Sequence, residues 1–147
     1  MKILIDGDSC SKLNTIETIA KEHNIPCHIF CDTKRIIESD YSEIHIIDCG
    51  TDAVDFALVN KCQKNDIVIT KDSGLAALAL SRNAFALNCY GQEYTKNNIM
   101  TYLNSRHIRS TESHKTNRKQ VKGTLKTANN NIPFYVTLNN IITKGNK

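Results

Sequence analysis

The sequence predicts an α/β protein with three layers, α/β/α, around a central, mostly parallel sheet of five strands. Short β-type runs alternate with longer helix-type segments, the order that gives parallel strands joined by right-handed crossovers. The length of 147 residues suits one domain around a single core. Hydrophobic residues make up 40% of the chain, with no run of about 18 that could span a membrane. We therefore expect a globular protein without a membrane segment.

The predicted strands and helices follow one another in regular order. The strands are short apolar runs at residues 2–5, 27–31, 43–47, 66–70 and 84–88. Between the first two, residues 11–24 place Leu13, Ile16 and Ile19 at helical spacing, and Pro26 marks the exit. The stretch 33–42 carries no clear pattern. Further helices are predicted at residues 52–63, 73–83 and 96–108.

The C-terminal part differs in composition from the rest. Residues 109–131 are polar and basic with almost no apolar periodicity, which predicts a mobile linker. Apolar residues return in IPFYVTLNNII, which favours a helix begun by Pro133, although FYVTL also suits an edge strand. The helix would carry Phe134, Leu138, Ile141 and Ile142 on one side. We thus expect an α/β domain over residues 1–108, then a basic polar linker and a short docking segment over 109–147.

Charge is divided unevenly along the chain. Residues 1–104 hold 10 Lys and Arg against 14 Asp and Glu, a net charge of −4. Residues 105–147 hold 9 Lys and Arg against one Glu, a net charge of +8. The acid at Asp6 comes too early for the core of a signal peptide, so a cytoplasmic location is expected.

The six cysteines show none of the CxxC pairs that zinc ribbons and redox sites use. They fall in apparent strands and helices, which favours buried thiols over disulfides. An irregularly spaced zinc site is the alternative, with ligands from Cys27, His28, Cys31, His45 and Cys49.

Acidic residues gather at the predicted carboxyl ends of strands, where open parallel sheets bind their ligands. Asp6 and Asp8 follow the first strand, Asp52 and Asp55 follow the third, and Asp72 follows the fourth. If these three strands are neighbours, up to five carboxylates meet in one cleft.

Carboxylates placed together repel one another unless a cation lies among them, and oxygen ligands suit Mg²⁺ or Mn²⁺. Such a metal activates water and neutralises the charge that develops on a phosphodiester, so the expected reaction is phosphodiester hydrolysis. We expect Asp6, Asp52 and Asp72 to hold the metal. Asp8 and Asp55 join Asp6 in catalysis by orienting the water or completing the second shell. The residues expected to contact phosphate near the metal are Ser9, Thr70, Lys71 and Ser73.

A purely structural interpretation exists for most of these acids. Asp8 or Ser9 would cap the helix over 11–24, and Asp72 or Ser73 would cap the helix over 73–83. Asp52 and Asp55 would form a reciprocal capping pair. Asp6 is poorly explained as a cap, because it ends an apolar strand and precedes a glycine.

Three motifs carry a family resemblance: ILIDGDSC, GTDAVDFALV and DIVITKDSGLAALAL. At these motifs the chain resembles the YaiI/YqxD family of uncharacterised bacterial proteins, whose domain is considered a relative of the PIN and NYN nuclease-like folds. The resemblance covers residues 1–108, and more weakly RKQVKG and the PF of IPFYVTLNNII. It implies a PIN-like three-layer fold with metal-binding acids at Asp6, Asp52 and Asp72.

The chain departs from the family pattern at two places. Ser11 stands where the first motif usually has proline, so the first helix is expected to start differently. PIN nucleases tend to supply a fourth acid after the strand-4 aspartate, where this chain has Ser73 and Gly74.

Two other functions compete with a nuclease. DGDS also resembles the nucleophile motif of haloacid-dehalogenase phosphatases, but Cys10 stands where these enzymes want Thr or Val, and their late acid pair is absent. A non-enzymatic RNA-binding or interaction module is the second alternative. Both the nuclease and the RNA-binding module would use basic residues of the C-terminal part to neutralise RNA phosphates. The alternative is that this part is a disordered solubilising segment. The basic residues concerned are Arg106, Arg109, Arg118, Lys119 and Lys122.

Overall fold

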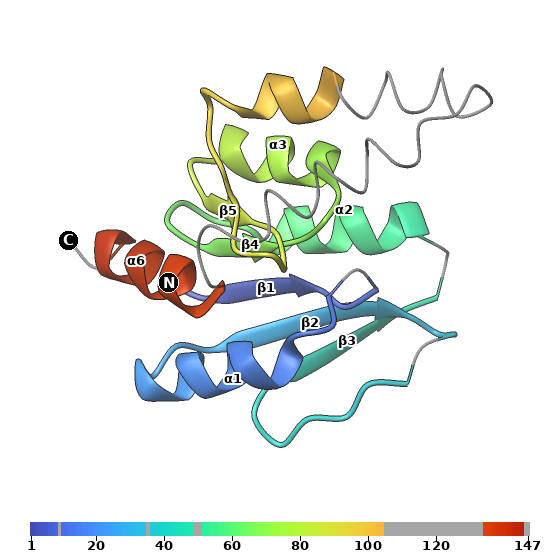
Figure 1. Cartoon of the computed structure of the whole chain (residues 1–147). Coiled ribbons are helices and arrows are strands. Elements are labelled where there is room, and N and C mark those ends of the chain that lie inside the picture. The colour runs from blue at the N-terminus through green and yellow to red at the C-terminus, as the bar shows by residue number, and fades with distance from the viewer. Residues whose placement is uncertain (9, 35, 49–50, 105–133, 146–147) are drawn as a thin grey trace, which may run out of the picture.

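A computed structural model describes residues 1–8, 10–34, 36–48, 51–104 and 134–145. Its centre is a sheet with strand order β3-β2-β1-β4-β5-β6 (Figure 1). The first five strands run parallel, as predicted, and β6 adds a short antiparallel edge on β5. The bounds are β1 Ile3–Asp6, β2 Cys27–Asp32, β3 Glu43–Ile47, β4 Ile67–Ile69, β5 Phe85–Leu87 and β6 Glu93–Tyr94.

Helices cover both faces of the sheet, which confirms the three-layer α/β/α prediction (Figure 1). The segment between β2 and β3 contains neither helix nor strand in its described residues. Residues 99–104 are helical, so the predicted helix over 96–108 begins three residues later than expected, after a turn at 96–98, and its predicted end lies outside the described residues. The other helices are α1 Leu13–Glu22, α2 Thr51–Lys61, α3 Ser73–Ser81 and α6 Phe134–Gly145.

The alternation of side chains along β1 divides the core into two layers. Ile3 and Ile5 are fully buried in the cluster that includes α1 and α6. Leu4 faces the opposite cluster, which includes α2 and α3. A strand with both faces covered needs apolar residues at every position, which explains the unbroken apolar run at the start of the chain.

The C-terminal segment is a helix, so the alternative of an edge strand is wrong. Its apolar stripe is buried in the same cluster as α1, which it contacts. The buried residues of this stripe are Phe134, Leu138, Ile141 and Ile142, as the spacing predicts. The predicted linker over 109–131 lies outside the described residues.

The described cysteines are free and buried, which confirms the prediction of buried thiols for Cys10, Cys27, Cys31, Cys62 and Cys89. Cys49 lies outside the described residues. Within the described part of the chain, no helix has both the length and the apolar character needed to cross a membrane.

Candidate functional site

The strand order reverses between β1 and β4. From β1 the chain moves outward to β2 and β3 and then returns to the other side of β1 as β4. Open α/β sheets bind ligands at such a reversal, beyond the carboxyl ends of the strands. The expectation that strands 1, 3 and 4 are neighbours is wrong for the third, because β2 lies between β1 and β3. The acids that follow β3 therefore approach this edge only through α2, which packs on β1 and β2.

Asp6 is the last residue of β1 and lies at this reversal. It is only 7% exposed, and its Oδ2 accepts a hydrogen bond of 3.0 Å from Thr70 Oγ1. The Thr70 hydroxyl oxygen in turn accepts the backbone N–H of Asp72, also at 3.0 Å. One buried hydroxyl thus connects the end of β1 to the loop after β4. The single hydroxyl proton of Thr70 goes to Asp6, so Thr70 positions that carboxylate. The predicted contact of Thr70 with phosphate stays a prediction.

Asp72 is the N-cap of α3. Its Oδ1 accepts from the backbone N–H groups of Gly74 at 2.8 Å and Leu75 at 3.4 Å, so the capping interpretation is confirmed. Ser73, the first residue of α3, is buried. A cap places a carboxylate at the positive end of the helix dipole, and Asp72 is therefore held at the carboxyl edge of the sheet.

Gly7 brings the chain close to β2 directly after Asp6. A Cβ at this position would lie 3.0 Å from the backbone oxygen of Phe30 and 2.9 Å from Ile37 Cδ1. The Gly7 N–H donates to the same Phe30 oxygen at 2.8 Å. A side chain at residue 7 would disturb this bond, so glycine fits the position between Asp6 and Asp8.

Asp8 and Asp55 are half-buried, in the turn after β1 and in α2 respectively. The alternative that Asp8 caps the first helix is wrong, because α1 begins at Leu13 with Lys12 as N-cap and no side-chain cap hydrogen bond. Of the other candidate residues, those outside the described side chains are Ser9, Asp52, Arg106, Arg109, Arg118, Lys119 and Lys122.

Cys10 interacts with Asp6, Cys89 and Lys71, and the sequence did not indicate this group. A hydrogen bond with Cys89 lowers the pKa of Cys10, and Lys71 acts in the same direction against the effect of burial. The same hydrogen bond and burial raise the pKa of Cys89. Lys71 is exposed, and its Nζ lies 5.1 Å from the centre of the Tyr90 ring. This edge of the sheet therefore combines buried negative and exposed positive charge.

The carboxylates do not form a compact three-ligand group among the described side chains. There, the one set of His, Cys, Asp and Glu ligand atoms that all lie within 4.8 Å of one another belongs to His28, Glu43 and His45. The zinc site that the sequence offers as an alternative includes these two histidines, but its cysteines do not belong to this set. Strand alternation explains the difference. Cys27 packs in the cluster on the α1 side of β2, and Cys31, four residues later, shares that face by alternation, whereas His28 shares the opposite face with Phe30.

Comparison with known proteins decides the family. A profile of the uncharacterised YaiI/YqxD family matches residues 4–144. The chain belongs to the YaiI/YqxD family. The match extends through α6, so the family pattern includes the C-terminal helix.

Similar proteins of this family occur in clostridia and their relatives. A UPF0178 protein of Clostridium acetobutylicum is 39% identical over 146 residues, which cover 99% of each chain. One from Lachnoclostridium phytofermentans is 40% identical over 97% of each chain. One from Clostridium novyi is 35% identical over all of this chain and 96% of its own. No experimentally solved structure matches the chain significantly.

Proposed function

We propose that the protein is a PIN-like, Mg²⁺- or Mn²⁺-dependent phosphodiesterase of ribonuclease type that acts on RNA. The observation that carries the proposal is Asp6, a buried carboxylate at the end of the central strand and beside the reversal of strand order. Burying a carboxylate costs several kcal/mol unless partners or a cation compensate it. A carboxylate at a ligand-binding edge is therefore better explained by function than by stability.

The absence of a compact three-carboxylate group among the described side chains is compatible with Mg²⁺. This ion keeps several waters and commonly takes only one or two protein carboxylates together with substrate phosphate. The Thr70 hydroxyl links the Asp6 carboxylate to the backbone N–H of Asp72. The carboxylates of Asp6 and Asp72 are the first two ligands of the proposed site. Asp52 is the proposed third ligand.

A metal held by Asp6, Asp72 and Asp52 would lower the pKa of a bound water and neutralise charge on the phosphodiester in the proposed reaction. Asp8 and Asp55 orient the attacking water. Lys71 and Ser73, which lie after β4, contact the phosphate together with Ser9. Basic residues between Arg106 and Lys122 neutralise neighbouring phosphates along the RNA, which an acidic edge cannot do.

The test is a titration of Mn²⁺ into the full chain, followed by RNA hydrolysis with Mg²⁺ and with Mn²⁺. The Asp6→Asn variant should lose metal affinity by more than about tenfold, since even outer-shell partners of a metal contribute this much. Hydrolysis should fall at least in proportion. Asp40→Asn is the matched control, because Asp40 is an exposed acid in the segment before β3.

Three outcomes would overturn the proposal. Unchanged Mn²⁺ affinity in Asp6→Asn removes the metal site. Salt-sensitive RNA binding without hydrolysis by the wild-type chain indicates the non-enzymatic module. A trapped aspartyl-phosphate on Asp6 indicates a phosphatase of the haloacid-dehalogenase kind.

A further inference from the structure

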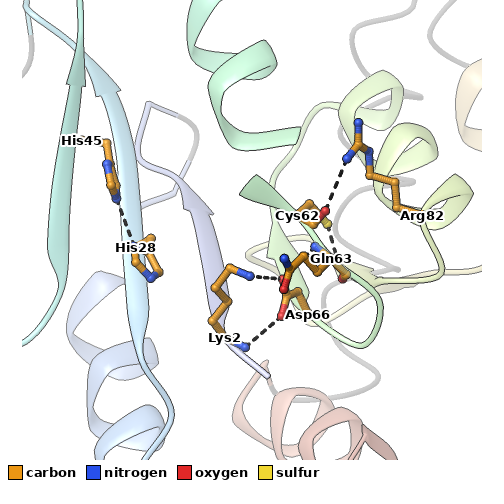
Figure 2. Close-up of polar contacts among 7 residues, drawn as sticks. All are labelled: Lys2, His28, His45, Cys62, Gln63, Asp66 and Arg82. Atoms are coloured by element: carbon orange, nitrogen blue, oxygen red, sulfur yellow. Dashed lines mark hydrogen bonds and ion pairs between the residues drawn. The ribbon is translucent and has the colours of Figure 1, made fainter. Parts of the chain in front are cut away.

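A second polar cluster lies at the amino-terminal ends of β2 and β3, away from the carboxyl edge that carries Asp6. His28 is the second residue of β2, and Glu43 and His45 are the first and third residues of β3. The parallel register pairs His28 with Glu43 and Phe30 with His45. Residues two apart on a strand share a face, so all three side chains emerge on the α2 side of the sheet. Figure 2 shows the two imidazoles directed toward each other across these strands.

Three ligand atoms converge in this cluster. His28 Nδ1 lies 3.0 Å from His45 Nε2 and 3.2 Å from Glu43 Oε2, and the last two atoms are 3.9 Å apart. Ligand atoms around a tetrahedral zinc ion, each at about 2.0–2.1 Å from the metal, are about 3.3 Å apart. A single ring proton joins only two of the three atoms, whereas a cation placed between them accepts electron pairs from all three.

The surroundings orient one of the rings and leave the carboxylate accessible. The His45 ring stacks on Phe30 with centroids 4.5 Å apart, which fixes its orientation. The carboxylate of Glu43 is 64% exposed, so it supplies negative charge without the cost of burial.

An open pocket of about 410 Å³ adjoins the cluster and leaves room for a further ligand. His28 and Glu43 line it, together with Asn24, Pro26, Cys27 and Tyr41. Cys27 is not a fourth ligand in this arrangement, because its side chain packs in the cluster on the α1 side of the sheet, opposite the face that carries His28.

We propose that His28, Glu43 and His45 form a zinc-class site with an exchangeable coordination position that faces this pocket. Two imidazoles and one carboxylate are a ligand set that suits Zn²⁺, with water in the open position. The site is separate from the proposed Mg²⁺ or Mn²⁺ site, so either proposal can fail without the other.

The test is a titration of Zn²⁺ and Co²⁺ into the full, chelator-treated chain. Calorimetry measures the binding of both ions, and visible absorption reports the geometry around Co²⁺. We expect one tetrahedral Co²⁺ ion per chain, with a visible spectrum that lacks a thiolate charge-transfer band. An ion on the carboxylates of the proposed Mg²⁺ or Mn²⁺ site would be octahedral and is thereby distinguished. Glu43→Gln and His45→Asn should each weaken binding by more than about tenfold. Glu43 is exposed, so its substitution carries little risk to folding.

His23→Asn is the matched control, since His23 is an exposed histidine that contacts Asn139 and lies outside the cluster. It should give the same tetrahedral Co²⁺ spectrum as the wild type. Absence of binding to the wild-type chain overturns the proposal. So does binding that persists in both Glu43→Gln and His45→Asn, or a thiolate band, which would place the ion on cysteine.

Discussion

At the scale of single residues, buried carboxylates serve two different purposes in this chain. Asp66 is as deeply buried as Asp6 but lies before β4, at the amino end of the strand. Its oxygens accept from the Lys2 backbone N–H at 3.1 Å, from Lys2 Nζ at 2.6 Å and from the Gln63 N–H at 2.8 Å (Figure 2). These donors fasten the start of the chain to β4, so the burial of Asp66 has a structural explanation.

Asp66→Ala should lower the free energy of unfolding by about 3 kcal/mol or more. The substitution leaves the Lys2 charge and the Gln63 N–H without their partner, and breaking a buried pair from one side costs this much. Urea unfolding measures the loss. Asp40→Ala, at an exposed acid, should change stability by less than about 0.5 kcal/mol. A loss below about 1 kcal/mol for Asp66→Ala would contradict this account.

At the scale of elements, the helix that follows β4 depends on Asp72 for its first turn. The spacing of TKDSG predicts either a metal ligand or a cap, and the structure shows the cap. The two roles are compatible, because a carboxylate has two oxygens and the cap uses Oδ1. A variant that removes the charge of Asp72 but keeps its capping hydrogen bonds shows whether Asp72 also holds a metal.

Two substitutions separate the capping role of Asp72 from its proposed metal-binding role. Asp72→Ala should lower stability by about 1 kcal/mol, because the cap is lost. Asp72→Asn keeps a good capping residue, so stability should change by only a few tenths of a kcal/mol while Mn²⁺ affinity and RNA hydrolysis fall. Thermal unfolding and the metal titration give the two readouts. Full metal affinity in Asp72→Asn would show that Asp72 is a cap alone.

At the scale of the whole molecule, the last helix completes the core that the first helix begins. Ile141 is fully buried in the cluster shared by α1 and α6, although more than a hundred residues separate these helices in sequence. Removal of the C-terminal segment would therefore expose one face of the sheet. Tests of the basic residues between Arg106 and Lys122 require charge-neutralising substitutions instead of truncation.

Ile141→Ala should lower the free energy of unfolding by about 2–5 kcal/mol, the usual cost of truncating a buried isoleucine. Thr143→Ala, two residues later on the exposed side of α6, should have an effect below about 0.5 kcal/mol. Urea denaturation of both variants, with an unchanged m-value, measures the difference. Equal stability of the two variants would show that α6 does not belong to the core.

The fold was largely predictable, because strands buried on both faces are apolar throughout and stand out from their helical crossovers. Ile3 to Ile5 and Ile67 to Ile69 are such runs. The helical spacing of Phe134, Leu138 and Ile141 likewise indicated the last helix. The two-residue strand β6 was not predictable, since pairing with β5 and burial of Tyr94 define it.

The sequence by itself determined which residues end the strands, and hence that Asp6 and Asp72 lie at one edge of a parallel sheet. Only the tertiary structure decided which strands are neighbours. It placed β2 between β1 and β3, which separates the third strand from Asp6, and brought His28 beside Glu43 and His45. Strand ends depend on local patterns of apolar residues. Strand order and register depend on contacts between residues far apart in sequence, and no local pattern records those contacts.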